Sequence, residues 1–79
     1  MLNLTKLNST GTLTKVELKN ITVYYSYSTP VAVECSEFNG STDKKYSVTT
    51  SKHVAQIGLN QNKMPHDKFE ALLKQYNII

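Results

Sequence analysis

The sequence predicts a small α+β protein: an antiparallel β-sheet of about four or five strands, followed by two helices that pack on one face of the sheet. Two observations support this fold class. Up to residue 48 the apolar and polar residues tend to alternate with the period of a half-buried strand, and from residue 50 the apolar residues recur at helical spacing. A chain of 79 residues has room for one hydrophobic core, so we expect a single domain over residues 1–79.

The N-terminal segment predicts a hairpin. Residues 2–7 alternate at first and lead into the turn-like sequence Asn-Ser-Thr-Gly. In residues 12–20, Val16 and Leu18 fall on one face, and the lysines and the glutamate beside them fall on the other. That spacing is typical of a strand with one buried face.

Residues 21–28 give the strongest strand pattern, because they are rich in β-branched and aromatic side chains. Ile21, Val23, Tyr25 and Tyr27 occupy alternate positions and therefore share one face. We expect all four of these side chains to lie in the core.

A further strand is expected over residues 31–38, where Val31, Val33 and Cys35 alternate with smaller or polar residues. The alternation predicts that Cys35 is a buried small hydrophobe. Residues 39–45 contain an Asn-Gly pair and predict a loop. Residues 46–48 then predict a short last strand.

The helical part begins with a short helix over residues 50–59, after which residues 60–63 form a polar connector. The clearest helical pattern covers residues 64–79, with Pro65 in the first turn, where a missing N–H is tolerated. Its apolar residues at positions i, i+3, i+4 and i+7 are Phe69, Leu72, Leu73 and Tyr76.

Composition excludes several classes of protein. The net charge of +3 comes from nine lysines with no arginine, and arginine is the usual reader of guanine and phosphate in sequence-specific DNA-binding proteins. The one cysteine excludes an intrachain disulfide and a cysteine-based zinc cluster. No apolar run is long enough for a signal peptide or a membrane span, so we expect an intracellular protein without membrane contact. So small a chain also has little room for a cofactor, and none is expected.

The sequence Thr50-Ser51-Lys52-His53 follows the predicted last strand and has two readings. In the structural reading, Thr50 or Ser51 caps the first helix by accepting a hydrogen bond from a free backbone N–H. In the functional reading, the free amides and the side chains of Ser51, Lys52 and His53 form an anion-binding corner.

Catalytic and metal sites are not expected. Ser51 and His53 are only two residues apart, and no oxyanion-hole motif accompanies them. His53 and His66 could hold a metal only with Asp67 or Cys35, and these residues lack the usual ligand spacing. The sequence therefore predicts a protein that is not an enzyme.

Tyr24 is expected on the polar face of its strand, among threonine and serine. Such a tyrosine can be structural, can anchor a protein interface, or can stack on a nucleic-acid base.

Two segments, Ser-Tyr-Ser-Thr-Pro-Val-Ala at residues 26–32 and Thr-Thr-Ser-Lys-His at residues 49–53, form a two-block pattern. The pattern resembles a family of small, uncharacterised proteins encoded mostly by bacteriophages, and the resemblance covers roughly residues 21–59. That family supplies no activity. The resemblance implies a phage accessory protein that acts in the cytoplasm of an infected bacterium.

We therefore expect a non-enzymatic protein that binds and blocks a host bacterial protein, such as an inhibitor of host defence of the anti-CRISPR kind. The expected contact residues are Tyr24, Thr50, Ser51, Lys52 and His53. A homodimer is a further expectation, because an open sheet edge can pair with itself. The alternative is a weak binder of single-stranded nucleic acid through Tyr24 and five lysines. These are Lys15, Lys19, Lys44, Lys45 and Lys52.

Overall fold

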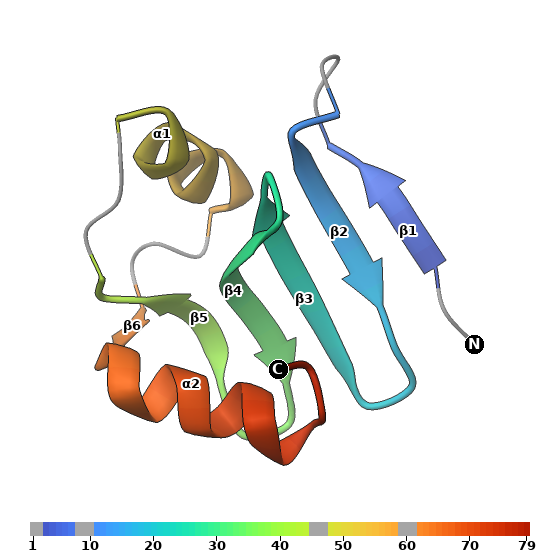
Figure 1. Ribbon diagram of the computed structural model, residues 1–79, viewed down its shortest axis with the longest axis vertical. Coiled ribbons are helices and arrows are strands. Elements are labelled where there is room, and N and C mark those ends of the chain that lie inside the picture. The colour runs from blue at the N-terminus through green and yellow to red at the C-terminus, as the bar shows by residue number, and fades with distance from the viewer. Residues whose placement is uncertain (1–2, 8–10, 45–47, 59–61) are drawn as a thin grey trace.

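The computed structural model describes residues 3–7, 11–44, 48–58 and 62–79 (Figure 1). Over these residues the chain forms two helices and one sheet of six strands in the order β1-β2-β3-β4-β5-β6. The elements are β1 (Asn3–Lys6), β2 (Leu13–Glu17), β3 (Ile21–Ser26), β4 (Thr29–Cys35), β5 (Asn39–Thr42), α1 (Val48–Ile57), β6 (Lys63–Met64) and α2 (His66–Gln75). The predicted α+β class is confirmed, and the predicted number of strands is approximately right.

The sheet is mixed. Strands β1 to β5 form an antiparallel meander, whereas the two-residue β6 pairs in parallel with β5. A parallel neighbour cannot be reached by a tight turn, so the chain passes through α1 between these two strands. Helix α1 is therefore a crossover helix, and α2 follows the completed sheet.

Helix α2 covers one face of the sheet and closes the main core, as its helical spacing predicts. Its buried residues pack against alternate residues of β3 and β4, and Met64 and Tyr76 pack at the margin. The helix begins at His66, whose backbone N–H donates to the Asp43 carboxylate at 2.9 Å. The buried core residues are Ile21, Val23, Val33, Phe69, Leu72 and Leu73.

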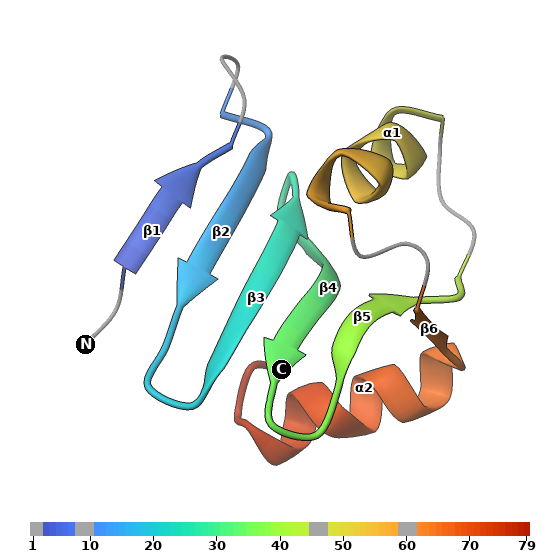
Figure 2. The ribbon, with the colours of Figure 1, turned by 180° about the vertical axis from the view of Figure 1, so that it is seen from behind.

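Helix α1 lies beside the end of β3, next to the turn between β3 and β4 (Figure 2). Tyr24 and Ile57 of α1 line one cavity, so α1 is on the side of the sheet that carries Tyr24. Its residue His53 contacts Ser26, which is three residues from Val23 and so faces away from α2. The predicted packing of helices on the sheet is thus approximately right. The prediction put both helices on one face, and α2 alone occupies that face.

The turn between β3 and β4 consists of Tyr27 and Ser28, because Ser26 pairs directly with Thr29. Tyr27 has φ +57°, a left-handed conformation that favours glycine at the first position of some two-residue hairpins. Its side chain is 58% exposed, so the prediction of Tyr27 in the core is wrong. Tyr25, two residues earlier on β3, does pack against the core as predicted.

Two connections differ from the prediction. Residues 39–42 form β5 instead of a loop, and residues 63–64 form β6 instead of part of a connector and a helix start. Val48 opens α1, so it does not belong to the strand predicted at residues 46–48; Tyr46 and Ser47 lie outside the described residues. The cause is a distant contact: the side chain of Asn62 donates to the Asn39 carbonyl at 2.7 Å, and the Ser41 N–H donates to the Asn62 carbonyl.

Candidate functional site

Helix α1 divides the predicted Thr50–His53 corner between two faces. Thr50 and His53 are three residues apart, so they share the face that lies on the sheet, and both are buried. Ser51 and Lys52 are exposed on the outer face. The corner therefore does not act as one unit, and Ser51 does not meet His53.

The capping prediction is wrong. Helix α1 begins at Val48, which makes Thr50 and Ser51 the third and fourth helical residues. Neither residue can occupy the cap position, which lies before the first helical residue. The helix starts two residues earlier than its apolar spacing indicates, and the residue preceding it, Ser47, lies outside the described part of the chain.

A hydrogen-bonded cluster forms instead beneath α1. His53 Nδ1 lies 2.7 Å from Ser26 Oγ, and Ser26 Oγ donates to Thr50 Oγ1 at 3.1 Å. Since Ser26 donates to Thr50, we assign the Nδ1 proton to His53, which then donates to Ser26. The other ring nitrogen, Nε2, accepts from Thr12 Oγ1 at 3.5 Å.

This cluster has the chemistry of a structural network. Ser26 is 1% exposed, so a substrate cannot reach its hydroxyl. Both contacts of the His53 ring nitrogens are with hydroxyl groups, those of Thr12 and Ser26. The Ser26 hydroxyl and both ring nitrogens of His53 have partners within the cluster, which ties α1 to the end of β3.

Tyr24 is not the exposed anchor that its position on a polar strand face predicts. Its side chain is 8% exposed, and its hydroxyl donates to Glu34 on the neighbouring strand. Burial, followed by the hydrogen bond and the negative charge of Glu34, raises the pKa of Tyr24 well above its ordinary value. Tyr24 remains a neutral hydrogen-bond donor across the physiological range.

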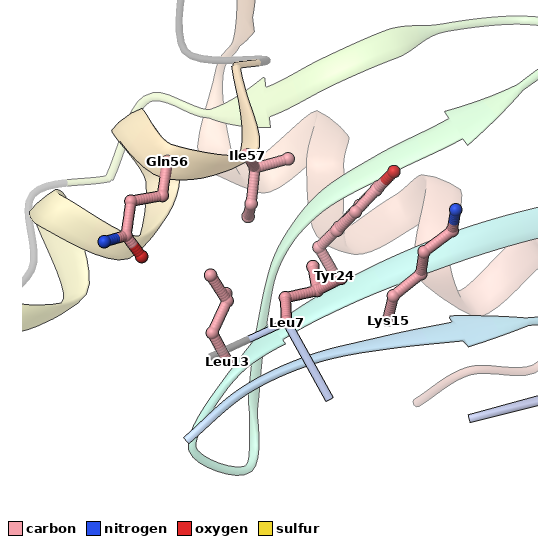
Figure 3. A pocket seen from close by; sticks show the side chains of 6 residues that line it. All are labelled: Leu7, Leu13, Lys15, Tyr24, Gln56 and Ile57. Atoms are coloured by element: carbon pink, nitrogen blue, oxygen red, sulfur yellow. The ribbon is translucent and has the colours of Figure 1, made fainter. Parts of the chain in front are cut away.

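One side of Tyr24 borders a cavity of about 480 Å³ between α1 and strands β2 and β3 (Figure 3). The walls combine aliphatic side chains with a lysine ammonium and a glutamine amide. Its size suits one large side chain of a partner, or a small ligand with an apolar body and a polar edge. The lining residues are Leu7, Leu13, Lys15, Tyr24, Gln56 and Ile57.

Tyr27 adds an exposed aromatic side chain at the same end of the molecule. Its ring centroid lies 5.8 Å from that of His53, and its backbone N–H donates to the Thr12 carbonyl. A tyrosine in a left-handed conformation is unusual, because its Cβ makes that conformation strained. Strained residues are often found at functional positions, which makes the exposed Tyr27 a candidate contact residue. We call Tyr27 and the cavity lining together the α1-end surface.

Sequence reasoning missed most of this surface. It singled out Tyr24 and, for the nucleic-acid alternative, Lys15, but assigned Tyr27 to the core and did not single out Leu7 or Gln56. The sequence Ser-Tyr-Ser-Thr at residues 26–29 lies between two runs rich in strand-forming residues and has the length of a hairpin turn. That length is the one feature of the sequence that indicates an exposed Tyr27. Because the turn lacks glycine and asparagine, the signal was weak.

The four described lysines of the nucleic-acid alternative do not gather on one face. Lys15 lies 3.7 Å from Glu17, while Lys19 follows β2 at the opposite end of the strands from α1 (Figure 1). Lys44 lies near α2, and Lys52 is on the outer face of α1. Lys45 lies outside the described residues.

The second histidine is also part of the fold. Thr42 Oγ1 lies 2.7 Å from His66 Nδ1, and His66 Nε2 lies 3.7 Å from Glu70. Thr42 is 5% exposed and also accepts from the Lys44 N–H, so its hydroxyl fastens β5 to the start of α2. Within the described residues, no group of three or more His, Cys, Asp or Glu side chains could hold a metal ion.

Neither described helix has the length and apolar character that crossing a membrane requires. Comparison with known proteins finds no match among curated proteins and none among solved structures. A family model does match residues 2–71, which include all six strands, α1 and the first half of α2. The chain belongs to a family of unknown function, DUF8033.

Proposed function

We propose that this protein is a non-enzymatic binding module that covers a surface on another protein through the α1-end surface. The observation that carries the proposal is the combination of exposed Tyr27 with the adjacent half-open cavity. Tyrosine is enriched among the residues that dominate binding energy, and such residues pair with pockets on the partner. A partner side chain entering the cavity would lie against Leu7 and Ile57.

The polar groups support binding over catalysis. The two hydroxyl–histidine pairs, Ser26–His53 and Thr42–His66, are the arrangements closest to catalytic chemistry. Both hydroxyls are buried and both pairs join one element to another. The scattered lysines favour a protein partner, because a protein that binds nucleic acid usually carries its basic residues clustered on one face.

The resemblance of the two-block pattern to phage-encoded proteins supports a narrower form of the proposal. In that form the protein acts in the cytoplasm of an infected bacterium, and the partner is a host protein such as a component of host defence. The mechanism is steric, because an occupied surface is unavailable to the partner's own ligand.

The test is capture of partners from a bacterial host lysate by the tagged protein, with variants matched in exposure. Tyr27→Asn keeps a residue that tolerates φ +57°, and Leu7→Asp places a charge at the cavity. Leu4→Asp is the control, since Leu4 is 61% exposed and does not line the cavity. We expect one protein to be retained by the wild type and the control and lost by both test variants.

Two results would overturn the proposal. One is a partner that Tyr27→Asn and Leu7→Asp both retain. The other is recovery of nucleic acid alone, with binding that falls steeply as the salt concentration rises, which would favour the lysine-based alternative.

A further inference from the structure

We propose that β1 pairs with β1 of a second copy of the chain, antiparallel and with Leu4 opposite Leu4, to join two sheets into one. This inference goes beyond the proposed function, because the interface lies at the sheet edge and not at the α1-end surface. It rests on the hydrogen-bonding direction of β1, on its side chains and on its charge.

Strand β1 has one free edge. It is the first strand of the sheet, and within the described part of the chain it pairs with β2 alone. The Leu7 N–H donates to the Leu13 carbonyl at 2.7 Å, and alternate residues of an antiparallel strand bond in alternate directions. Asn3 and Thr5 therefore bond toward β2, which leaves the N–H and C=O groups of Leu4 and Lys6 pointing outward.

The outward groups define how a second copy can pair. Residues opposite each other in a sheet share a face, so a symmetric antiparallel pair can be centred on Leu4, Thr5 or Lys6. Centring on Lys6 would set two ammonium groups side by side, which is destabilising. Centring on Thr5 would put Leu4 against Lys6. Centring on Leu4 lets the two copies exchange a pair of backbone hydrogen bonds at Leu4 and keeps the Lys6 residues apart.

The side chains favour the same centre. Leu4 pairs with Val16 and shares its face, yet Leu4 is 61% exposed, the most exposed large apolar residue described. Neither helix lies over β1 (Figures 1 and 2). In the Leu4-centred pair, Val16, Leu4 and their two copies would form one continuous apolar strip across the joined sheet.

Area and charge set the strength of the pair. A strand of four residues forms an interface well below the roughly 1,200 Å² of stable complexes, so the dimer should dissociate on dilution. Two copies that each carry a net charge of +3 also repel. Salt screens this repulsion, so association should strengthen as salt rises, which is the opposite of nucleic-acid binding.

Sedimentation velocity over a range of concentrations tests the association. We expect a monomer–dimer equilibrium for the wild type and for Leu7→Asp, whose N–H bonds inward, and a monomer at every concentration for Leu4→Asp. Circular dichroism should show the same fold for both variants, because both positions are exposed. A wild type that stays monomeric at high concentration and high salt overturns the proposal, as does a Leu4→Asp variant that still dimerises.

Disulfide trapping tests the register in a Cys35→Ser background, where the engineered thiol is the only one. Leu4→Cys places two thiols in directly opposed positions, within the separation that a disulfide spans. Lys6→Cys places them four residues out of step, too far apart to bond. We expect a covalent dimer from Leu4→Cys alone. Trapping through Lys6→Cys, or through Thr5→Cys in place of Leu4→Cys, refutes the register.

Discussion

The Ser26–His53 hydrogen bond provides the sharpest test of whether the buried cluster is structural. Ser26→Ala removes the acceptor of the His53 Nδ1 proton and also the donor to Thr50. His53 is 7% exposed, so water replaces the lost partner poorly. A lost hydrogen bond together with an unpaired buried donor costs about 2–3 kcal/mol in the free energy of unfolding. In a domain of this size the melting temperature should fall by about 12–18 °C.

A double-mutant cycle isolates the pair. His53→Leu removes the donor, and a further Ser26→Ala change then leaves no unpaired ring nitrogen at this position. The double variant should therefore be more stable than the sum of the single effects predicts, by at least about 1 kcal/mol. Urea unfolding followed by far-ultraviolet circular dichroism measures all four proteins. Ser28→Ala, at an exposed position in the nearby turn, is the matched control and should change stability by less than about 0.5 kcal/mol.

The reasoning is refuted if Ser26→Ala changes stability no more than Ser28→Ala does. It is also refuted if the Ser26 and His53 effects add within experimental error. In either case α1 would be held on the sheet by something other than this network.

Two further predictions concern the rest of the fold. Gly40→Ala should destabilise the protein by about 2 kcal/mol or more, because its Cβ would collide with the backbone oxygen of Asn62. Thermal unfolding measures the effect. The control is Gly58→Ala, whose Cβ meets nothing within 4 Å, so that this variant bears only the cost of φ +82°. The hydrogen bond to Glu37, followed by burial and the neighbouring Cys35, raises the pKa of Tyr76 to about 12 from 10.0. The protein is therefore stabilised below pH 10 and loses that contribution as pH rises from 10 to 12. Glu37→Gln should bring the pKa back toward 10.0 in an ultraviolet titration; an unchanged titration contradicts the assignment.

The spacing of apolar residues along the chain predicted three strands and the second helix. Alternation located β2, β3 and β4, and the helical spacing of Phe69 and Leu73 located α2 and its buried face. Strands β5 and β6 were missed because their pairing depends on Asn62, which is 23 residues from Asn39 in the sequence. An Asn-Gly pair predicts a turn from its neighbours alone, and only the distant backbone shows why Gly40 belongs in a strand.

The candidate site was harder to predict, because it is assembled from separate elements. Sequence reasoning noticed His53 but could not see that Ser26, 27 residues earlier, would be its partner. It left structural and binding roles open for Tyr24 on a polar strand face, and the structure shows that Tyr24 is buried with its hydroxyl bonded to Glu34. It read Tyr27 as core because the strand period was continued one residue past the end of β3.

The exposure of β1 has a consequence for the order in which the native protein opens. Leu4, Thr5 and Lys6 are all exposed, so separating β1 from β2 uncovers less apolar surface than opening the core does. We expect its amide protons to exchange with deuterated solvent through a local opening, far faster than those of the buried Val23 and Val33. Each such opening briefly presents β2 as the outermost strand, so the border of the sheet alternates between two sequences while the core beneath α2 stays closed.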